Sequence, residues 1–141
     1  PVHAEVQERL GRLTPEHRPH WGRTPAQQMA CHFTDQLRVT LGDTPMQAPT
    51  GPLTNRLARW FLIHVMPWPE ARIQTSRGML LTQPTEWQAD LRNLQALLAR
   101  FVERKQNRSW GNHAAFGSLS GKEWGVITFR YFDHHLRQFG V

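Results

Sequence analysis

The sequence has few of the features that identify a function on their own. One of its 141 residues is cysteine, Cys31, so the chain cannot form an internal disulfide. It has no GxSxG motif, no phosphate-binding loop and no dinucleotide-binding fingerprint. Its N-terminal region lacks the apolar run that a signal peptide or a membrane span needs. We therefore expect a cytoplasmic protein with a reduced thiol and no membrane partner.

Lysine is scarce as well. The chain has 2 lysines and 15 arginines against 11 acidic residues, which gives a formal net charge of +6. A positive charge of this size is compatible with nucleic-acid binding. However, the arginines are scattered over every segment, and no basic run and no known DNA- or RNA-binding motif accompanies them. We therefore do not expect nucleic acid to be a partner.

Apolar residues at helical spacing predict five helices, and no segment has convincing strand character. The expected helices cover residues 3–13, 25–41, 54–66, 85–105 and about 121–139. A chain of this length can bury a core without disulfides or a structural metal. We expect one all-α domain over residues 1–141, with long loops at 43–54, 70–84 and 109–119.

Several expected helices start with a capping signal. A serine or threonine followed three residues later by glutamate or glutamine is the form of a capping box. The pairs with this spacing are Ser120/Glu123, Thr24/Gln27 and Thr85/Gln88. Pro25 suits a first helical position, and Gly42 is expected to end the helix that Pro25 begins.

The last helix is apolar over most of its circumference. One broad face carries Trp124, Ile127, Thr128, Tyr131, His134, His135 and Gln138. Phenylalanines and Leu136 occupy another face, and only a narrow strip suits water. Such a helix is usually interior. We therefore expect its histidines to face a partner helix or a polar pocket between helices.

Apolar stripes also mark the faces that we expect the other helices to bury. Helix 25–41 has Met29, Ala30, Phe33 and Leu37, with His32 at the edge of the stripe, and helix 85–105 has Trp87, Leu91, Leu94, Leu98 and Phe101. Helix 54–66 has Leu57, Trp60, Phe61 and His64. This pattern predicts that His64 is a core histidine, while His113 in the 109–119 loop is expected to form hydrogen bonds.

Histidines converging in a bundle are able to bind a divalent metal, but the usual helical pair is missing. Two histidines four residues apart would lie on one face of a helix. Here the position four before His135 is Tyr131, and the position four before His134 is Arg130. Spacing alone favours hydrogen-bonded structural histidines and a packed tyrosine over metal ligands. Cys31 and its neighbour on the helix point apart, which argues against a cysteine–histidine dyad.

Six segments together resemble the DinB-like (DinB/YfiT) superfamily of metal-dependent helical-bundle proteins, in a small bacterial branch. They are Trp21–Thr24, Met29–His32, Leu37–Asp43, Pro67–Pro69, Phe116–Gly125 and Tyr131–Gly140. The resemblance implies a four-helix bundle with an additional short helix and long connecting loops. It also implies a shallow site for zinc, nickel or iron, made by one histidine of the second helix and two, four apart, of the last.

Carried over to this chain, the resemblance makes His32 the first metal ligand and His135 the last. Tyr131 stands where the family pattern has the middle histidine. Two imidazoles and a phenol make a poorer zinc or nickel site than three imidazoles. The residues expected to line the pocket are Gln28, Tyr131, His134 and Gln138.

Two functions follow from the resemblance. Better-understood members of the superfamily imply a metal-dependent thiol S-transferase or hydrolase that acts on a small thiol. The alternative is a non-catalytic bundle that uses the same groove for a small ligand or for homodimerisation, having lost its metal with the middle histidine. The sequence leaves open which holds, and whether His64 or His113 contributes to the site.

Overall fold

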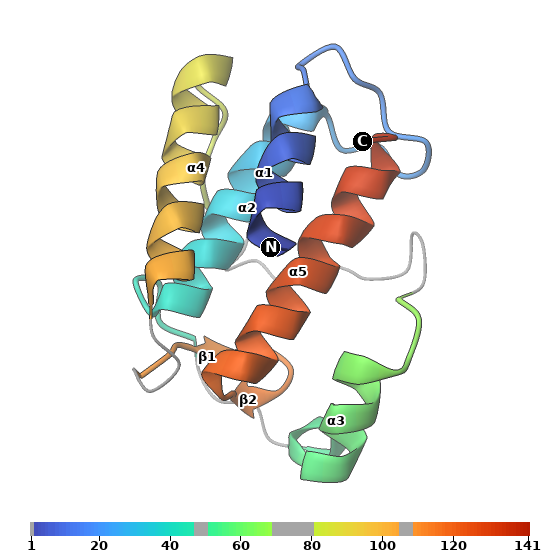
Figure 1. Cartoon of the computed structure of the whole chain (residues 1–141), viewed down its shortest axis with the longest axis vertical. Helices are drawn as coiled ribbons and strands as arrows, with labels where there is room; N and C mark the ends of the chain where they lie inside the picture. Colours follow the sequence, from blue (N-terminus) through green and yellow to red (C-terminus); the bar gives the residue numbers. More distant parts are fainter. Residues whose placement is uncertain (1, 47–50, 69–80, 105–108) are drawn as a thin grey trace.

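A computed structural model describes residues 2–46, 51–68, 81–104 and 109–141. Within these ranges the elements are α1 (Val2–Arg12), α2 (Ala26–Leu41), the 3-10 turn η1 (Pro52–Thr54), α3 (Arg56–His64), α4 (Trp87–Glu103), β1 (Asn112–His113), β2 (Gly117–Ser118) and α5 (Gly121–Gln138) (Figure 1). The predicted all-α class is confirmed. Among the described residues no helix is long and apolar enough to cross a membrane. Parts of the expected loops and helix ends, at 47–50, 69–80 and 105–108, lie outside the described ranges.

The core lies between α1, α2, α4 and α5, which run side by side in Figure 1. α2 packs against both α4 and α5, and α1 packs against α5. At the centre, Phe33 of α2 and Phe132 of α5 stack face to face, with ring centroids 4.1 Å apart. Leucines from all four helices surround this pair, as the apolar stripes of these helices predicted.

A partly buried arginine fastens α1 to the end of α5. The Arg9 guanidinium donates a hydrogen bond to the Asp133 carboxylate and another to the Val141 carbonyl, both at 2.9 Å. Charge-assisted bonds of this kind are stronger than neutral ones. The first helix, with Val6 and Leu10 buried beneath it, is thereby held over the half of α5 that carries the histidines.

The Ser120/Glu123 capping box is confirmed. The Glu123 amide donates to Ser120 Oγ, and the Ser120 amide donates to the Glu123 carboxylate at 2.8 Å. Gly42 ends α2 with a φ of 81°, a conformation that glycine adopts without strain.

The other two predicted capping boxes are wrong. At α2 the capping position falls on Pro25, whose side chain has no acceptor. At α4 the cap is Glu86, whose carboxylate accepts from two amides of the first turn, while the Thr85 hydroxyl donates to Asp90. A carboxylate is the better partner for the positive end of a helix, which explains why Glu86 takes the place of the threonine.

A short antiparallel hairpin forms where the sequence predicted only loop. β1 pairs with β2 through two residues on each strand. His113 stabilises the turn between them, because its Nδ1 accepts hydrogen bonds from the amides of Ala115 and Phe116. Burial lowers the His113 pKa from 6.5 to about 4. Gly111, just before the hairpin, lies against the C-terminal end of α2. A Cβ at Gly111 would collide with the Val39 carbonyl.

The prediction for α3 is wrong about the buried face. Leu57 is 77% exposed and Trp60 53%, whereas Ile63 on the other side of the helix is fully buried. His64 is exposed, with its ring stacked on Trp60, so it is not a core histidine. α3 stands at one end of the molecule beside the start of α5, and no described helix covers its outer side (Figure 1).

Candidate functional site

Three rings that the sequence singled out lie together between α2 and α5. The His32 ring centroid is 5.3 Å from that of Tyr131 and 5.6 Å from that of His135, and the last two are 4.7 Å apart. Tyr131 and His135 share a face of α5 because they are four residues apart, and His32 faces them from α2. We call His32, Tyr131 and His135 the three-ring cluster. That these residues bind a metal stays a prediction.

The Tyr131 hydroxyl is buried and has no hydrogen-bond partner within the described ranges. Burial raises the pKa of this phenol well above its ordinary value, and the negative charge of Asp35 raises it further. The hydroxyl therefore keeps its proton at neutral pH. A buried donor without a partner costs roughly 1–3 kcal/mol, so this atom is poised to bind an acceptor atom of a ligand.

His135 is neutral at physiological pH. Burial lowers its pKa from 6.5 to about 4, whereas the hydrogen bond that His135 donates to Gln138 raises the pKa. Electrostatic interactions with His32 and His134 lower the pKa further. A neutral imidazole carries a lone pair on one ring nitrogen, which is the form that binds a metal or accepts a proton.

The hydrogen bonds around Gln138 determine which nitrogen carries that lone pair. The Gln138 Nε2 donates to the Trp21 carbonyl at 2.6 Å, which fixes the orientation of the amide. Its oxygen Oε1 then lies 3.1 Å from His135 Nδ1. Because this oxygen only accepts, Nδ1 must be the protonated nitrogen, and Nε2 has the lone pair. Partners of this kind orient the histidines of metal sites.

The loop before α2 contacts both the backbone and the side chain of Gln138. The His20 amide donates to the Gln138 carbonyl at 2.7 Å. Gly22 has a φ of 75°, and a Cβ there would lie 2.8 Å from Gln138 Nε2. Both the positive φ and the close contact with Gln138 therefore favour glycine at position 22. Trp21 and Gly22 together hold the Gln138 side chain that orients His135.

The remaining predicted pocket residues lie at different distances from the three-ring cluster. His134 is buried beside the Trp21 and Trp68 rings, with its centroid 5.0 Å from that of His135. Gln28 is half-buried on α2, one turn before His32, and contributes none of the hydrogen bonds that the described residues make around the three rings.

Two other buried residues of α2 are Cys31, which the sequence analysis considered, and Asp35, which it did not. Cys31 is buried, which raises its pKa to about 11 with smaller contributions from nearby acids, so the thiol keeps its proton at neutral pH. Asp35 was missed. Its buried carboxylate accepts from the amides of Leu81 and Thr82 at 2.7 and 2.9 Å and from the Thr82 hydroxyl. The sequence offered one signal for Asp35, because an acidic residue stands between the core residues Phe33 and Leu37.

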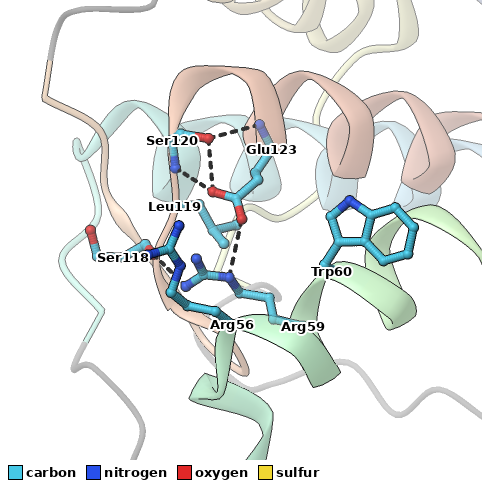
Figure 2. A pocket seen from close by; sticks show the side chains of 7 residues that line it. All are labelled: Arg56, Arg59, Trp60, Ser118, Leu119, Ser120 and Glu123. Carbon is cyan, nitrogen blue, oxygen red and sulfur yellow. Dashed lines mark hydrogen bonds and ion pairs between the residues drawn. The ribbon is translucent and has the colours of Figure 1, made fainter.

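A pocket of about 530 Å³ lies elsewhere, between α3 and the start of α5. Figure 2 shows the Arg59 guanidinium beside the Glu123 carboxylate, 3.1 Å away, with Trp60 at the edge. The residues that line the pocket are Arg56, Arg59, Trp60, Ser118, Leu119, Ser120 and Glu123. Arg59 also donates to the Ser118 carbonyl at 3.0 Å, which joins α3 to the hairpin.

The donor set of the three-ring cluster fits a metal in part. In the described ranges no three histidine, cysteine, aspartate or glutamate residues are grouped so that they could hold an ion. The cluster supplies two imidazoles and one phenol, and its orphaned Tyr131 hydroxyl is the third possible donor. The raised pKa of this phenol opposes phenolate ligation unless a cation offsets it.

No protein-family model matches the chain, and no similar protein was found among curated proteins or solved structures. Membership of the DinB-like superfamily therefore stays a prediction, based on the six sequence segments.

Proposed function

We propose that the chain is a DinB-like bundle protein in which His32 and His135 hold a divalent metal beside the Tyr131 hydroxyl. The reaction that suits this site is metal-dependent S-transfer or hydrolysis with a small thiol. The observation that carries the proposal is the convergence of two imidazoles, from α2 and α5, around a buried hydroxyl that has no partner among the described residues.

Each residue of the cluster has a separate role. His135 offers Nε2, because its Nδ1–H is engaged by Gln138. His32 offers its ring from the opposite helix. A divalent cation there would stabilise a thiolate at neutral pH and leave a coordination position open for it. Tyr131, protonated and desolvated, is suited to donate a hydrogen bond to the bound thiol or to its acceptor.

The raised pKa of Tyr131 favours a second candidate function. A phenol that keeps its proton leaves two imidazoles as metal ligands, and such a site holds zinc or nickel weakly. The same three groups would bind a small neutral ligand through the hydroxyl donor and the His135 acceptor. The chain would then be a non-catalytic binding protein that uses the same groove.

Metal binding separates the two candidates. The protein, prepared without a histidine tag, would be titrated with zinc, nickel and ferrous ions by calorimetry, followed by elemental analysis after desalting. We expect about one equivalent per chain, lost in His32→Ala and in His135→Ala. His64→Ala is the matched control, because it removes an exposed histidine of α3 that is not part of the cluster. Absence of binding to the wild-type protein at every metal concentration would rule out the metal-dependent function.

A further inference from the structure

An apolar surface is exposed on η1 and α3 and on the residues that follow them. It consists of Leu53, Leu57, Trp60, Phe61, Val65 and Met66. Each of these side chains is at least 42% exposed, and together they present on the order of 600 Å². We call these six residues the α3 apolar surface. Single exposed apolar residues are ordinary, whereas six large ones between positions 53 and 66 mark a candidate interaction site.

α3 cannot turn this surface toward its own core. Its opposite side is already engaged, because Ile63 is fully buried against the start of α5. Arg59 pairs with Glu123 near its N-terminal end. At the other end, Arg130 of α5 donates to the carbonyls of Leu62, Ile63 and Met66. The helix is therefore fixed on both sides with its apolar stripe outward.

The spacing of the stripe suits a second helix. Leu57, Trp60, Phe61 and His64 follow the i, i+3, i+4, i+7 pattern by which one helix packs along another. The pattern is also symmetrical about its centre, with the two large aromatic residues in the middle. A two-fold interface requires a patch that complements itself, and an antiparallel pair of such stripes meets this requirement.

We infer that the α3 apolar surface is a homodimer interface, in which two copies of α3 pack antiparallel about a two-fold axis near Trp60 and Phe61. Leu57 would then lie beside the partner's His64. This inference is independent of the proposed function, because the surface is formed by α3 and the three-ring cluster by α2 and α5.

The charges around the surface agree with a second copy. The stripe carries no charged residue and Arg59 is already paired with Glu123, so Arg56 is the cation beside the stripe whose charge a partner can complement. Arg56 has no ion pair or hydrogen bond in the described part of the chain, and it lies at the N-terminal end of α3, where a cation is unfavourable. Antiparallel pairing brings it beside the C-terminal end of the partner's α3, where a cation is favourable.

The area is also close to what a stable pair needs. A standard interface buries about 800 Å² on each partner, and the α3 apolar surface supplies most of that. The rest is available at its edge, where the pocket of Figure 2 opens between Arg56, Trp60 and Leu119. A partner side chain is able to enter this pocket, as anchors do at the centres of interfaces.

Analytical ultracentrifugation tests the interface. We expect the wild-type protein to sediment with twice the mass of one chain and to dissociate on dilution, and Phe61→Glu to sediment as a monomer at every concentration. Val102→Glu is the matched control, since Val102 is 41% exposed on α4, and it should stay dimeric. A monomeric wild-type protein, or a Phe61→Glu variant that stays dimeric, would overturn the inference.

Cysteine cross-linking tests the antiparallel register. The one native thiol, Cys31, is buried and unreactive, so an introduced cysteine is the reactive one. Near a two-fold axis, Phe61→Cys should form a disulfide-linked dimer on oxidation with copper phenanthroline, whereas Val102→Cys should not. Equal cross-linking of the two variants would contradict the proposed axis. Phe61→Glu should also keep the metal affinity of the wild type, so dimerisation and the proposed function can fail separately.

Discussion

Histidine lies beside aromatic rings at two places in this chain, in the three-ring cluster and on the outer side of α3. Both places combine a histidine with an aromatic residue four positions earlier, Tyr131 with His135 and Trp60 with His64. The first pair faces α2 and is desolvated, whereas the second faces away from every described helix. Helical spacing therefore specifies which residues share a face, and the packing of other elements decides whether that face is buried.

The difference in burial has chemical consequences. In the three-ring cluster, desolvation keeps His135 neutral and Tyr131 protonated, and the Tyr131 hydroxyl has no partner in the part of the chain that the structure describes. These are the conditions for binding a ligand. On α3, Trp60 and His64 stay in contact with water. Their apolar surface is therefore available for a partner to cover. One region is therefore suited to small-molecule chemistry and the other to association.

The largest contrast is expected in stability. Phe33 is fully buried in the core, and Phe61 is half exposed on α3. Phe33→Ala should cost about 3–5 kcal/mol of unfolding free energy. Phe61→Ala should change it by about 0.5 kcal/mol or less, when urea denaturation is measured at concentrations that keep the chain monomeric. Similar losses from the two substitutions would mean that α3 is packed as tightly as the core.

The next effect concerns pH. The His135 pKa is about 4 in the folded protein and 6.5 ordinarily, so between these values the unfolded chain binds more protons and stability falls as pH falls. The loss from this residue is complete below pH 4 and amounts to on the order of 3 kcal/mol. Urea denaturation of His135→Gln between pH 4 and 6.5 should show a shallower slope than wild type. His113, with a pKa also near 4, should account for a slope that remains.

A third effect restores the missing histidine. Tyr131→His should raise zinc affinity about tenfold or more, because a third imidazole joins His32 and His135. Gln7→His is the matched control, since it places a second histidine four residues after His3 on the exposed side of α1. Calorimetric titration compares them. Equal gains in the two variants would show that the three-ring cluster offers no advantage over a surface pair.

The smallest effect comes from the orphaned hydroxyl. Tyr131→Phe removes a buried donor without a partner, so the free protein should become more stable by about 1 kcal/mol. Bound ligand or metal should offset the gain, which thermal unfolding with and without added zinc would measure. A loss of stability in the free variant would mean that the hydroxyl is satisfied in solution.

Local features of the fold were predictable from the sequence. The Ser120/Glu123 capping box involves four consecutive residues, and the core stripe of α2 needs only its own helical spacing. The convergence of His32 with Tyr131 and His135 came from the resemblance, because the separate helices give no relative placement. Short-range chemistry therefore accounted for most of the helices, and the resemblance anticipated that these three rings lie together.

The errors arose where distant residues compete. Thr85 had the form of a cap, but Asp90 binds its hydroxyl and Glu86 caps the helix instead. The stripe of α3 looked like a core face, although no described helix covers it. The partners of Asp35 lie 46 and 47 positions later in the chain, where no local pattern points to them.

The Asp35 carboxylate also has a consequence for hydrogen exchange. The amides of Leu81 and Thr82 belong to a stretch without regular secondary structure, yet both donate to a carboxylate that is almost entirely buried. They should exchange with deuterium at rates typical of a packed helix, far more slowly than the coil around them. Two protected amides ahead of α4 would therefore report on the opening of α2, one turn away from His32.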